Sequence, residues 1–244
     1  LTTLTIPSNV SSIGVSAFDG CTGIKELVIA DSDSTLTLID EVGTHNGLFT
    51  ECPLEKLYVG RNLSYSTKET AGFSPFYAIE ELKTITIGDK VTAIPGFFLY
   101  NCTGFSDIII PDNIVTIGSN AFCGCTAFTS FTIPDGITTI SEYMLATCSN
   151  LTTVIIPEGV TTIGSNAFAN CSKLENINLP NSITSIGSYA FYNIGATTIV
   201  LPPNVTSIWN RAFASCSKIK SITIPQSVKS FGAYVFYECT GDIT

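Results

Sequence analysis

Charged side chains and long apolar runs are both scarce in this sequence. Only 13% of its 244 residues are charged, 45% are hydrophobic, and the formal net charge is −9. We expect no binding to nucleic acid, because affinity for phosphate backbones depends on clustered Lys and Arg. No run reaches the roughly 18 consecutive apolar residues that a spanning helix needs, so we expect no membrane insertion.

The residues and motifs of common catalytic sites are also scarce. His45 is the one histidine, and no regularly spaced nucleophile accompanies it as a Ser-His-Asp or Cys-His site would require. Neither G-x-x-x-x-G-K-[ST] nor G-x-G-x-x-G is present. We therefore expect no enzyme, no catalytic residues and no cofactor. A basic segment followed by an apolar one is also missing at the start, which is typical of a mature or trimmed chain.

A 23-residue repeat accounts for most of the chain. Its most regular copy, residues 151–173, reads LTTVIIPEGVTTIGSNAFANCSK, and its residues define positions 1 to 23. Other regular copies begin at Leu1, Leu82, Phe105, Phe128, Leu174, Ala196 and Ile219. Longer, irregular copies occupy residues 24–53 and 54–81. The repeat predicts one solenoid domain over 1–244, in which the coils at 1–23 and 82–241 are regular and 24–81 is irregular.

The spacing within one unit predicts its local structure. Apolar residues alternate toward the end of 151–156, as expected of a strand with one face turned inward. Pro157 ends this strand, because proline lacks the N–H that a ladder needs. Val160 and Ile163 indicate a second, shorter extended segment. Residues 165–171 are too few for a stable isolated helix, so we expect one helical or 3-10 turn. This turn is expected to bury Ala167, Phe168 and Cys171.

The pattern L-x-x-[VIL]-x-[IL]-P-x-x-[VI]-x-x-I-G-x-x-A-F-x-x-C resembles the BspA-like, or Treponema-type, leucine-rich repeats of bacterial surface proteins. The resemblance covers essentially 1–241 and is weakest at 24–81. It implies an α/β repeat solenoid, right-handed, of about ten coils, with a parallel β-sheet on one face. A second short strand and short helical or 3-10 turns complete each coil. It also implies an extracellular or cell-surface protein that takes part in adhesion and binds host proteins.

Cysteine follows the repeat rather than a catalytic pattern. Eight of the nine cysteines share position 21: Cys21, Cys52, Cys102, Cys125, Cys148, Cys171, Cys216 and Cys239. A buried ladder is the favoured interpretation. Neighbouring coils are close enough for disulfides, but Ile79 and Ile194 replace cysteine in two coils, as a core position tolerates. Cys123, at position 19, is expected near the surface. Its pairing with Cys125 lacks the histidines typical of a metal site, so we expect no metal.

The irregular coils carry half of the 20 carboxylates. They include DSDS at 31–34 and DE at 40–41, which we interpret as a solvated loop. A calcium site stays open as an alternative, although the full D-x-D-x-D-G pattern is missing. Insertions in solenoids often map to the binding face, and Tyr65 and Tyr77 are expected to be exposed there.

Aromatic residues gather on the turn side of three adjacent coils. The candidate ligand-binding residues are Tyr189, Tyr192, Trp209, Tyr234 and Tyr237. Tyrosine and tryptophan are enriched where proteins bind one another, and stacked aromatic rings also suit sugars. Alternatively, the rings pack flat over the edge or lie under another domain. The outward strand positions, mostly Thr and Ser, form a weakly charged sheet that also suits protein docking.

These features predict a non-enzymatic, secreted or cell-surface binding module that recognises a protein partner, with a host protein as one candidate. Two alternatives stay open. The chain is a structural spacer of a larger surface protein, or it is a carbohydrate-binding module that uses the aromatic residues.

Overall fold

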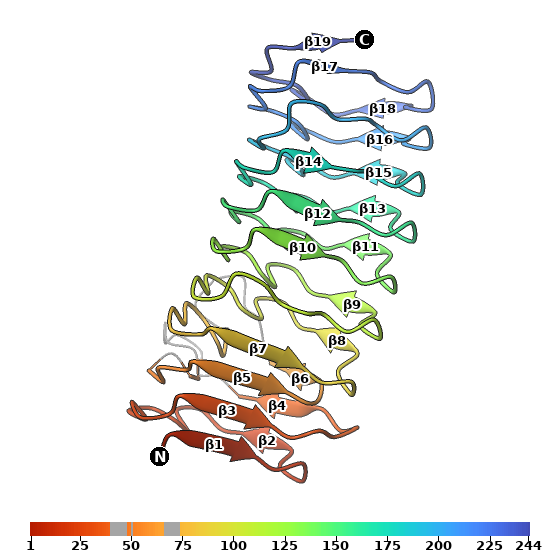
Figure 1. The fold of residues 1–244 in the computed structure, drawn as a ribbon. Helices are drawn as coiled ribbons and strands as arrows, with labels where there is room; N and C mark the ends of the chain where they lie inside the picture. Colours follow the sequence, from red (N-terminus) through yellow and green to blue (C-terminus); the bar gives the residue numbers. More distant parts are fainter. Residues whose placement is uncertain (40–47, 50, 66–73) are drawn as a thin grey trace.

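In the computed structural model, the chain winds into a parallel β-solenoid of about ten turns (Figure 1). The structure describes residues 1–39, 48–49, 51–65 and 74–244. The two termini lie at opposite ends of the stack, and each coil lies directly on the one before it (Figure 1). The predicted solenoid is therefore confirmed.

Two rows of strands run along the stack. The first row, near the start of each coil, comprises β1 (Thr3–Ile6), β3 (Glu26–Ile29), β5 (Lys56–Val59), β7 (Thr84–Ile87), β10 (Ser130–Thr132), β12 (Thr153–Ile155), β14 (Asn176–Ile177), β17 (Ser221–Ile222) and β19 (Asp242–Ile243). The second row comprises β2 (Ser12–Ile13), β4 (Leu36–Leu38), β6 (Leu63–Ser64), β8 (Ala93–Ile94), β9 (Thr116–Ile117), β11 (Thr139–Ile140), β13 (Thr162–Ile163), β15 (Ser185–Ile186), β16 (Ser207–Ile208) and β18 (Ser230–Phe231).

All pairing between strands is parallel and joins equivalent positions of neighbouring coils. Phe131 pairs with Val154 in the first row, and Ile140 pairs with Ile163 in the second. Both partners lie one repeat apart, so the repeat length sets the register. The first row is interrupted between β7 and β10 and between β14 and β17, because the fully described coils at 105–127 and 196–218 contribute no strand to it. The prediction of a parallel sheet with a second short strand is confirmed.

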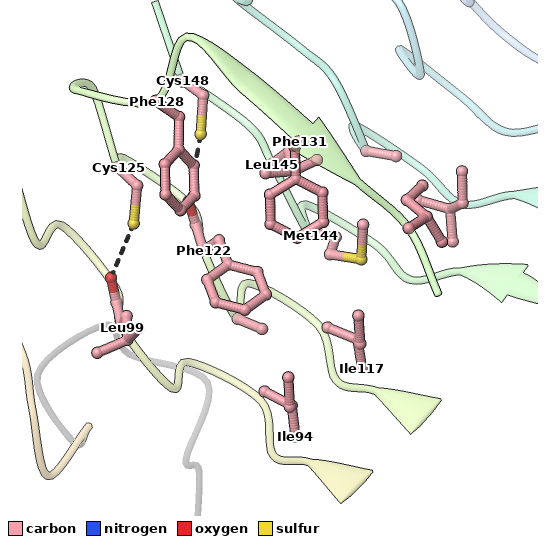
Figure 2. Packing of buried hydrophobic residues seen from close by; sticks show 14 of the residues in the cluster. Ile94, Leu99, Ile117, Phe122, Cys125, Phe128, Phe131, Met144, Leu145 and Cys148 are labelled. Carbon is pink, nitrogen blue, oxygen red and sulfur yellow. Dashed lines mark hydrogen bonds between the residues drawn. The ribbon is translucent and has the colours of Figure 1, made fainter. Parts of the chain in front are cut away.

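The inward side chains of all coils form one continuous core. At position 18, phenylalanine rings stack from coil to coil: Phe168 on Phe191 at 5.4 Å, and Phe191 on Phe213 at 5.3 Å between ring centres. The rings of each pair are nearly parallel, at 5° and 13°. Earlier in the chain, the rings of Phe122 and Phe131 pack against each other in the core with an angle of 54° between their planes (Figure 2). One coil alone leaves these rings exposed, so stacking provides the hydrophobic stabilisation.

The segment after the second strand is a series of turns, so the prediction of a helical or 3-10 turn is wrong. Asn166 and Asn170 take left-handed backbone angles, with φ of 58° and 61°, which a right-handed helix does not allow. The N–H groups also alternate in direction. Ala167 N donates to Gly164 O within the turn at 3.3 Å, whereas Phe168 N donates to Ala190 O of the next coil at 2.9 Å. The predicted burial of Ala167, Phe168 and Cys171 is confirmed.

Position 21 forms the predicted cysteine ladder, with a feature that the sequence did not indicate. Most of its buried thiols donate to a carbonyl of the preceding coil, as in Cys125 to Leu99 O at 3.2 Å and Cys148 to Phe122 O at 3.3 Å (Figure 2). Cys102, Cys171 and Cys216 do the same. All nine cysteines are free thiols. Burial raises the pKa of the Cys171 thiol to about 12. These residues are therefore core residues that also make a weak hydrogen bond.

Cys123 is buried as well, so its predicted place near the surface is wrong. It is 6% exposed, and its sulfur lies 3.8 Å from Thr147 Oγ1. The small residues at the same position of the next two coils, Ala146 and Ala169, are equally buried. Position 19 is buried where it holds cysteine or alanine, and it reaches the surface where it holds aspartate or tyrosine.

Candidate functional site

The candidate site begins with the backbone at position 16. Tyr189, Arg211 and Tyr234 occupy this position in three successive coils, with φ of 56°, 53° and 58°. Left-handed backbone costs a residue other than glycine, asparagine or aspartate about 1–2 kcal/mol. Asn120 and Asn166, which tolerate this conformation, occupy position 16 in two other coils. The bulky residues at this position are therefore held in a conformation that suits them poorly.

Backbone hydrogen bonds fix the spacing of these three residues. Tyr189 N donates to Asn210 O, and Arg211 N donates to Ala233 O, both at 2.9 Å. Each residue at position 16 is thereby tied to the residue before its counterpart in the next coil. The side chains at position 16 project from a rigid ladder with one residue per coil.

Arg211 lies between the two tyrosines. Its Nη1 donates to the Tyr189 hydroxyl at 2.7 Å. The guanidinium carbon lies 5.7 Å from the ring centre of Tyr189 and 5.2 Å from that of Tyr234. Both distances fall within the range of cation–π attraction. The hydrogen bond to Tyr189 raises the pKa of Arg211 above its ordinary value, so the guanidinium stays charged. We call Tyr189, Arg211 and Tyr234 the tyrosine–arginine column.

Two further tyrosines flank this column. Tyr192 meets Tyr189 edge-on at 5.7 Å and 65°, and Tyr237 meets Tyr234 edge-on at 5.9 Å and 86°. Tyr234 is 63% exposed and Tyr237 is 52% exposed, while Tyr189 and Tyr192 are half-buried. We call the column together with Tyr192 and Tyr237 the aromatic ridge. Four of the five predicted site residues therefore lie in one contiguous cluster.

Trp209, the fifth predicted residue, is exposed but lies outside these contacts. It is 52% exposed and precedes Arg211 by two residues in the same coil. Among the described residues, it takes part in none of the ring pairs or cation–π contacts that build the ridge. Trp209 thus borders the ridge in sequence without being packed into it.

The sequence interpretation missed Arg211. Selecting aromatic residues alone at position 16 passes over this coil, because its side chain is an arginine between two tyrosine coils. The signal was present, since the column holds Tyr, Arg and Tyr in consecutive copies of the repeat. A search for cations that the repeat stacks against aromatic rings would have found it.

The charge around the ridge differs in sign from that of the chain. Residues 196–241 contain four cations, Arg211, Lys218, Lys220 and Lys229, and one carboxylate, Glu238, whereas the whole chain has a net charge of −9. Glu238 accepts a hydrogen bond from Ser215 Oγ at 2.9 Å. The salt bridges in the described part of the chain join Lys25 to Glu55 and Lys90 to Asp33, far from the ridge. Among the described residues, no carboxylate pairs with Arg211.

A shallow groove on the first-row sheet is the second candidate surface. It has a volume of about 530 Å³ and lies across the seventh to ninth copies of the repeat, residues 151–218, where Ile155, Glu175 and Thr198 contribute to its walls. Ile155 is 58% exposed. The groove combines threonine, asparagine and apolar side chains with a single charge. This lining agrees with the predicted weakly charged sheet, but it selects no particular ligand.

The two tyrosines expected to be exposed in the irregular coils are half-buried, so that expectation is wrong. The Tyr65 hydroxyl donates to Gly96 O at 3.1 Å, and burial raises the pKa of this hydroxyl. Tyr77 stacks on Tyr100 at 5.8 Å between ring centres. Both rings support the packing of long coils against their neighbours rather than a binding loop.

Part of the acidic cluster has protein partners. Asp31 accepts a hydrogen bond from the Tyr58 hydroxyl at 2.7 Å, and Asp33 pairs with Lys90 at 2.9 Å. In the described ranges, no group of three or more His, Cys, Asp and Glu converges as metal ligands. His45 and the pair at 40–41 lie outside the described residues. A solvated loop stays the prediction there, with calcium binding as the open alternative.

The described part of the chain includes no helix with the length and apolar character needed to cross a membrane.

The stacked coils, their two rows of strands and their repeat define a leucine-rich-repeat solenoid. The sequence matches the family model described as the BspA type leucine rich repeat region, in six copies over residues 1–71, 44–175 and 138–244. The chain belongs to this family, as the resemblance of its repeat predicted.

Solved structures show the same fold. A leucine-rich repeat protein from Bacteroides ovatus superposes with a TM-score of 0.61 at 24% identity, over 98% of this chain and 62% of that one. A leucine rich cell surface protein from Faecalibacterium prausnitzii gives 0.54 at 24% identity, over 100% and 69%. The pneumococcal vaccine antigen PcpA gives 0.54 at 22% identity, over 99% and 68%. The chain thus spans about three fifths of the Bacteroides ovatus protein. No curated protein matches the chain.

Proposed function

We propose that the chain is a non-enzymatic binding module of a secreted or cell-surface bacterial protein, and that it recognises a protein partner through the aromatic ridge. The family and the similarity to a protein described as a leucine rich cell surface protein support this location. The repeat supplies the scaffold, and exposed side chains supply the function, as in other solenoids.

One observation carries the assignment to the ridge. Tyr189 and Tyr234 take left-handed backbone at a position where other coils carry asparagine. A bulky residue in this conformation lowers stability, and Tyr234 is 63% exposed, so burial does not compensate for the loss. Phe97 and Tyr143 take the same backbone at this position, and Tyr189 and Tyr234 differ from them in packing on the Arg211 guanidinium between them. Backbone strain is concentrated at functional sites. Exposed tyrosines in such a place are explained by contact with another molecule.

A protein partner agrees with the ridge better than a neutral sugar does. Sugars stack on open ring faces, whereas one face of Tyr189 and one face of Tyr234 are turned to the Arg211 guanidinium. The flanking tyrosines meet these rings edge-on. The half-exposed edges and hydroxyl groups suit a protein surface, where tyrosine and arginine contribute most of the binding energy.

The test compares two variants that make the same chemical change. In Tyr189→Asn/Tyr234→Asn, asparagine replaces both tyrosines of the column. In Tyr143→Asn, it replaces a tyrosine that is 41% exposed at the same position, with φ of 55°, but between Asn120 and Asn166. Relief of the left-handed strain should raise the free energy of unfolding of Tyr143→Asn in urea by about 1 kcal/mol. In Tyr189→Asn/Tyr234→Asn the lost contacts with Arg211, Tyr192 and Tyr237 offset this gain.

Random peptides displayed on phage are then selected on the unmodified chain. We expect enriched peptides to lose binding to Tyr189→Asn/Tyr234→Asn by at least about tenfold, which corresponds to roughly 1.4 kcal/mol, and to bind Tyr143→Asn normally. Failure to enrich any peptide, or equal binding to both variants, contradicts recognition through the ridge and favours the role of a structural spacer. Binding of neutral oligosaccharides that depends on the same tyrosines would favour the carbohydrate alternative.

A further inference from the structure

We propose that Arg211 is the receptor for a carboxylate of the partner protein, so that the aromatic ridge recognises an Asp or Glu side chain flanked by apolar residues. This inference rests on the proposed function and names the chemistry of the partner.

The hydrogen-bonding capacity of Arg211 carries the inference. A guanidinium has five N–H donors in a fixed fork. In the described structure, one Arg211 side-chain bond is formed, from Nη1 to the Tyr189 hydroxyl. That acceptor is neutral, and no described carboxylate pairs with the group. The remaining donors match the two oxygens of a carboxylate, which arginine binds in a bidentate manner.

The two tyrosine rings prepare the guanidinium for this role. They hold it at 5.7 Å and 5.2 Å from their centres, on a backbone that is bonded to the next coil. A long arginine side chain ordinarily loses rotamer freedom when it binds. Here the column restricts it beforehand, which lowers the entropy lost on association. The half-buried setting also screens the charge less than open water does.

The surrounding charge and surface favour a protein carboxylate. Residues 196–241 carry four cations and one carboxylate in a chain of net charge −9, so an acidic segment is attracted to these coils and repelled by the rest. Beside Arg211, Tyr234, Tyr237 and Trp209 are each more than half exposed. These rings offer apolar contact to the neighbours of an acidic residue.

A double-mutant cycle tests the inference. The best peptide enriched on the unmodified chain is synthesised with its acidic residue and with the matching amide, Glu→Gln or Asp→Asn. Each is titrated against the unmodified chain and against Arg211→Gln by isothermal calorimetry. We expect the amide to bind the unmodified chain at least about tenfold more weakly, as expected when a charged hydrogen bond is lost. Arg211→Gln should remove this difference, and circular dichroism confirms that the variant is folded.

The outcomes separate this inference from the proposed function. Enriched peptides that lack an acidic residue, or a tenfold loss that persists in Arg211→Gln, overturn the carboxylate receptor while recognition through the ridge stands. If peptides bind Tyr189→Asn/Tyr234→Asn as tightly as the unmodified chain, both the carboxylate receptor and recognition through the ridge are overturned. An oligosaccharide of glucuronic acid that binds more tightly than any peptide, and depends on Arg211, overturns the protein origin of the carboxylate.

Discussion

At the scale of single residues, position 21 shows why cysteine recurs in a core that isoleucine also fits. The Cys171 thiol is buried and donates to Leu145 O at 3.1 Å. The Leu145 carbonyl already accepts a hydrogen bond from the backbone N–H of Cys148. The thiol is therefore a second, weak donor. Isoleucine at 194 gives up only this weak bond and keeps the packing, which explains why the ladder tolerates it.

The ladder predicts which thiols react. Iodoacetamide at pH 8 should modify Cys21 and Cys239 first, because both are half-buried in end coils. The other seven cysteines are buried. Burial raises the pKa of Cys102 and Cys171 to about 12, so at pH 8 their reactive thiolate form is scarce. Mass spectrometry of peptides measures the modification, and all nine should react in guanidinium chloride. Rapid native modification of Cys125 or Cys148 would contradict the ladder.

At the scale of the elements, backbone hydrogen bonds join the turn segment of each coil to the next, from Ala78 N to Tyr100 O as far as Ser215 N to Tyr237 O. Half of the turn's N–H groups bond to the next coil and half bond within the turn. This arrangement places the residue at position 18 over its counterpart in the next coil, so the phenylalanine rings stack face to face. The ladder fixes the core ring and the outward residue at position 16 together.

Removing one ring from the middle of this stack should be costly. Phe191 is fully buried between Phe168 and Phe213, so Phe191→Ala should lower the free energy of unfolding by about 3–5 kcal/mol. Phe191→Leu is the matched control, because Leu99 and Leu145 occupy this position in other coils. Urea unfolding followed by circular dichroism measures both. Equal losses for alanine and leucine would show that ring volume at this position matters little.

The sequence predicted what the repeat determines and missed what single contacts determine. Strand rows, register and the cysteine ladder follow from residues that recur at fixed spacing. The prediction for the turn was wrong, because hydrogen bonds to the next coil hold the backbone of Asn166 in a left-handed conformation. Arg211 was missed because its role depends on rings in the two neighbouring coils. Four of the five predicted site residues lie in one cluster, because repeat spacing alone brings them together, and their role in binding stays a prediction.

At the scale of the whole molecule, contacts in a solenoid normally join each coil only to its neighbours. Arg61 is an exception. Its side chain is fully buried, and it donates from Nη1 to Ser8 O at 3.0 Å and Val10 O at 2.8 Å, and from Nη2 to Pro7 O at 2.9 Å. These hydrogen bonds join residues that are 51 to 54 positions apart in the sequence. They therefore link the first coil to the third, across the whole of the second. Coils 1 to 3 should therefore open as one cooperative unit.

Arg61→Met tests this coupling, because methionine keeps the length of the side chain and removes every donor. Three carbonyls of the corner at Pro7–Val10 then lose the hydrogen bonds that Arg61 donates. Hydrogen exchange measured by mass spectrometry should accelerate by at least about tenfold over β1 and β2, the change that about 1.4 kcal/mol of lost local stability produces. Exchange over β11, β13 and β15 should stay unchanged, since those strands depend on their own neighbours.

Arg61→Lys separates the charge from the geometry of the fork. Lysine keeps the positive charge but presents a single ammonium group, which does not reproduce the planar contacts of arginine with three carbonyls. If hydrogen exchange over β1 and β2 accelerates about as much in Arg61→Lys as in Arg61→Met, the coupling depends on the guanidinium fork rather than on the charge. Exchange at the unmodified rate in both variants, or acceleration spread evenly along the chain, would contradict a cooperative unit at coils 1 to 3. A local effect means that this solenoid departs from nearest-neighbour behaviour where its irregular coils begin.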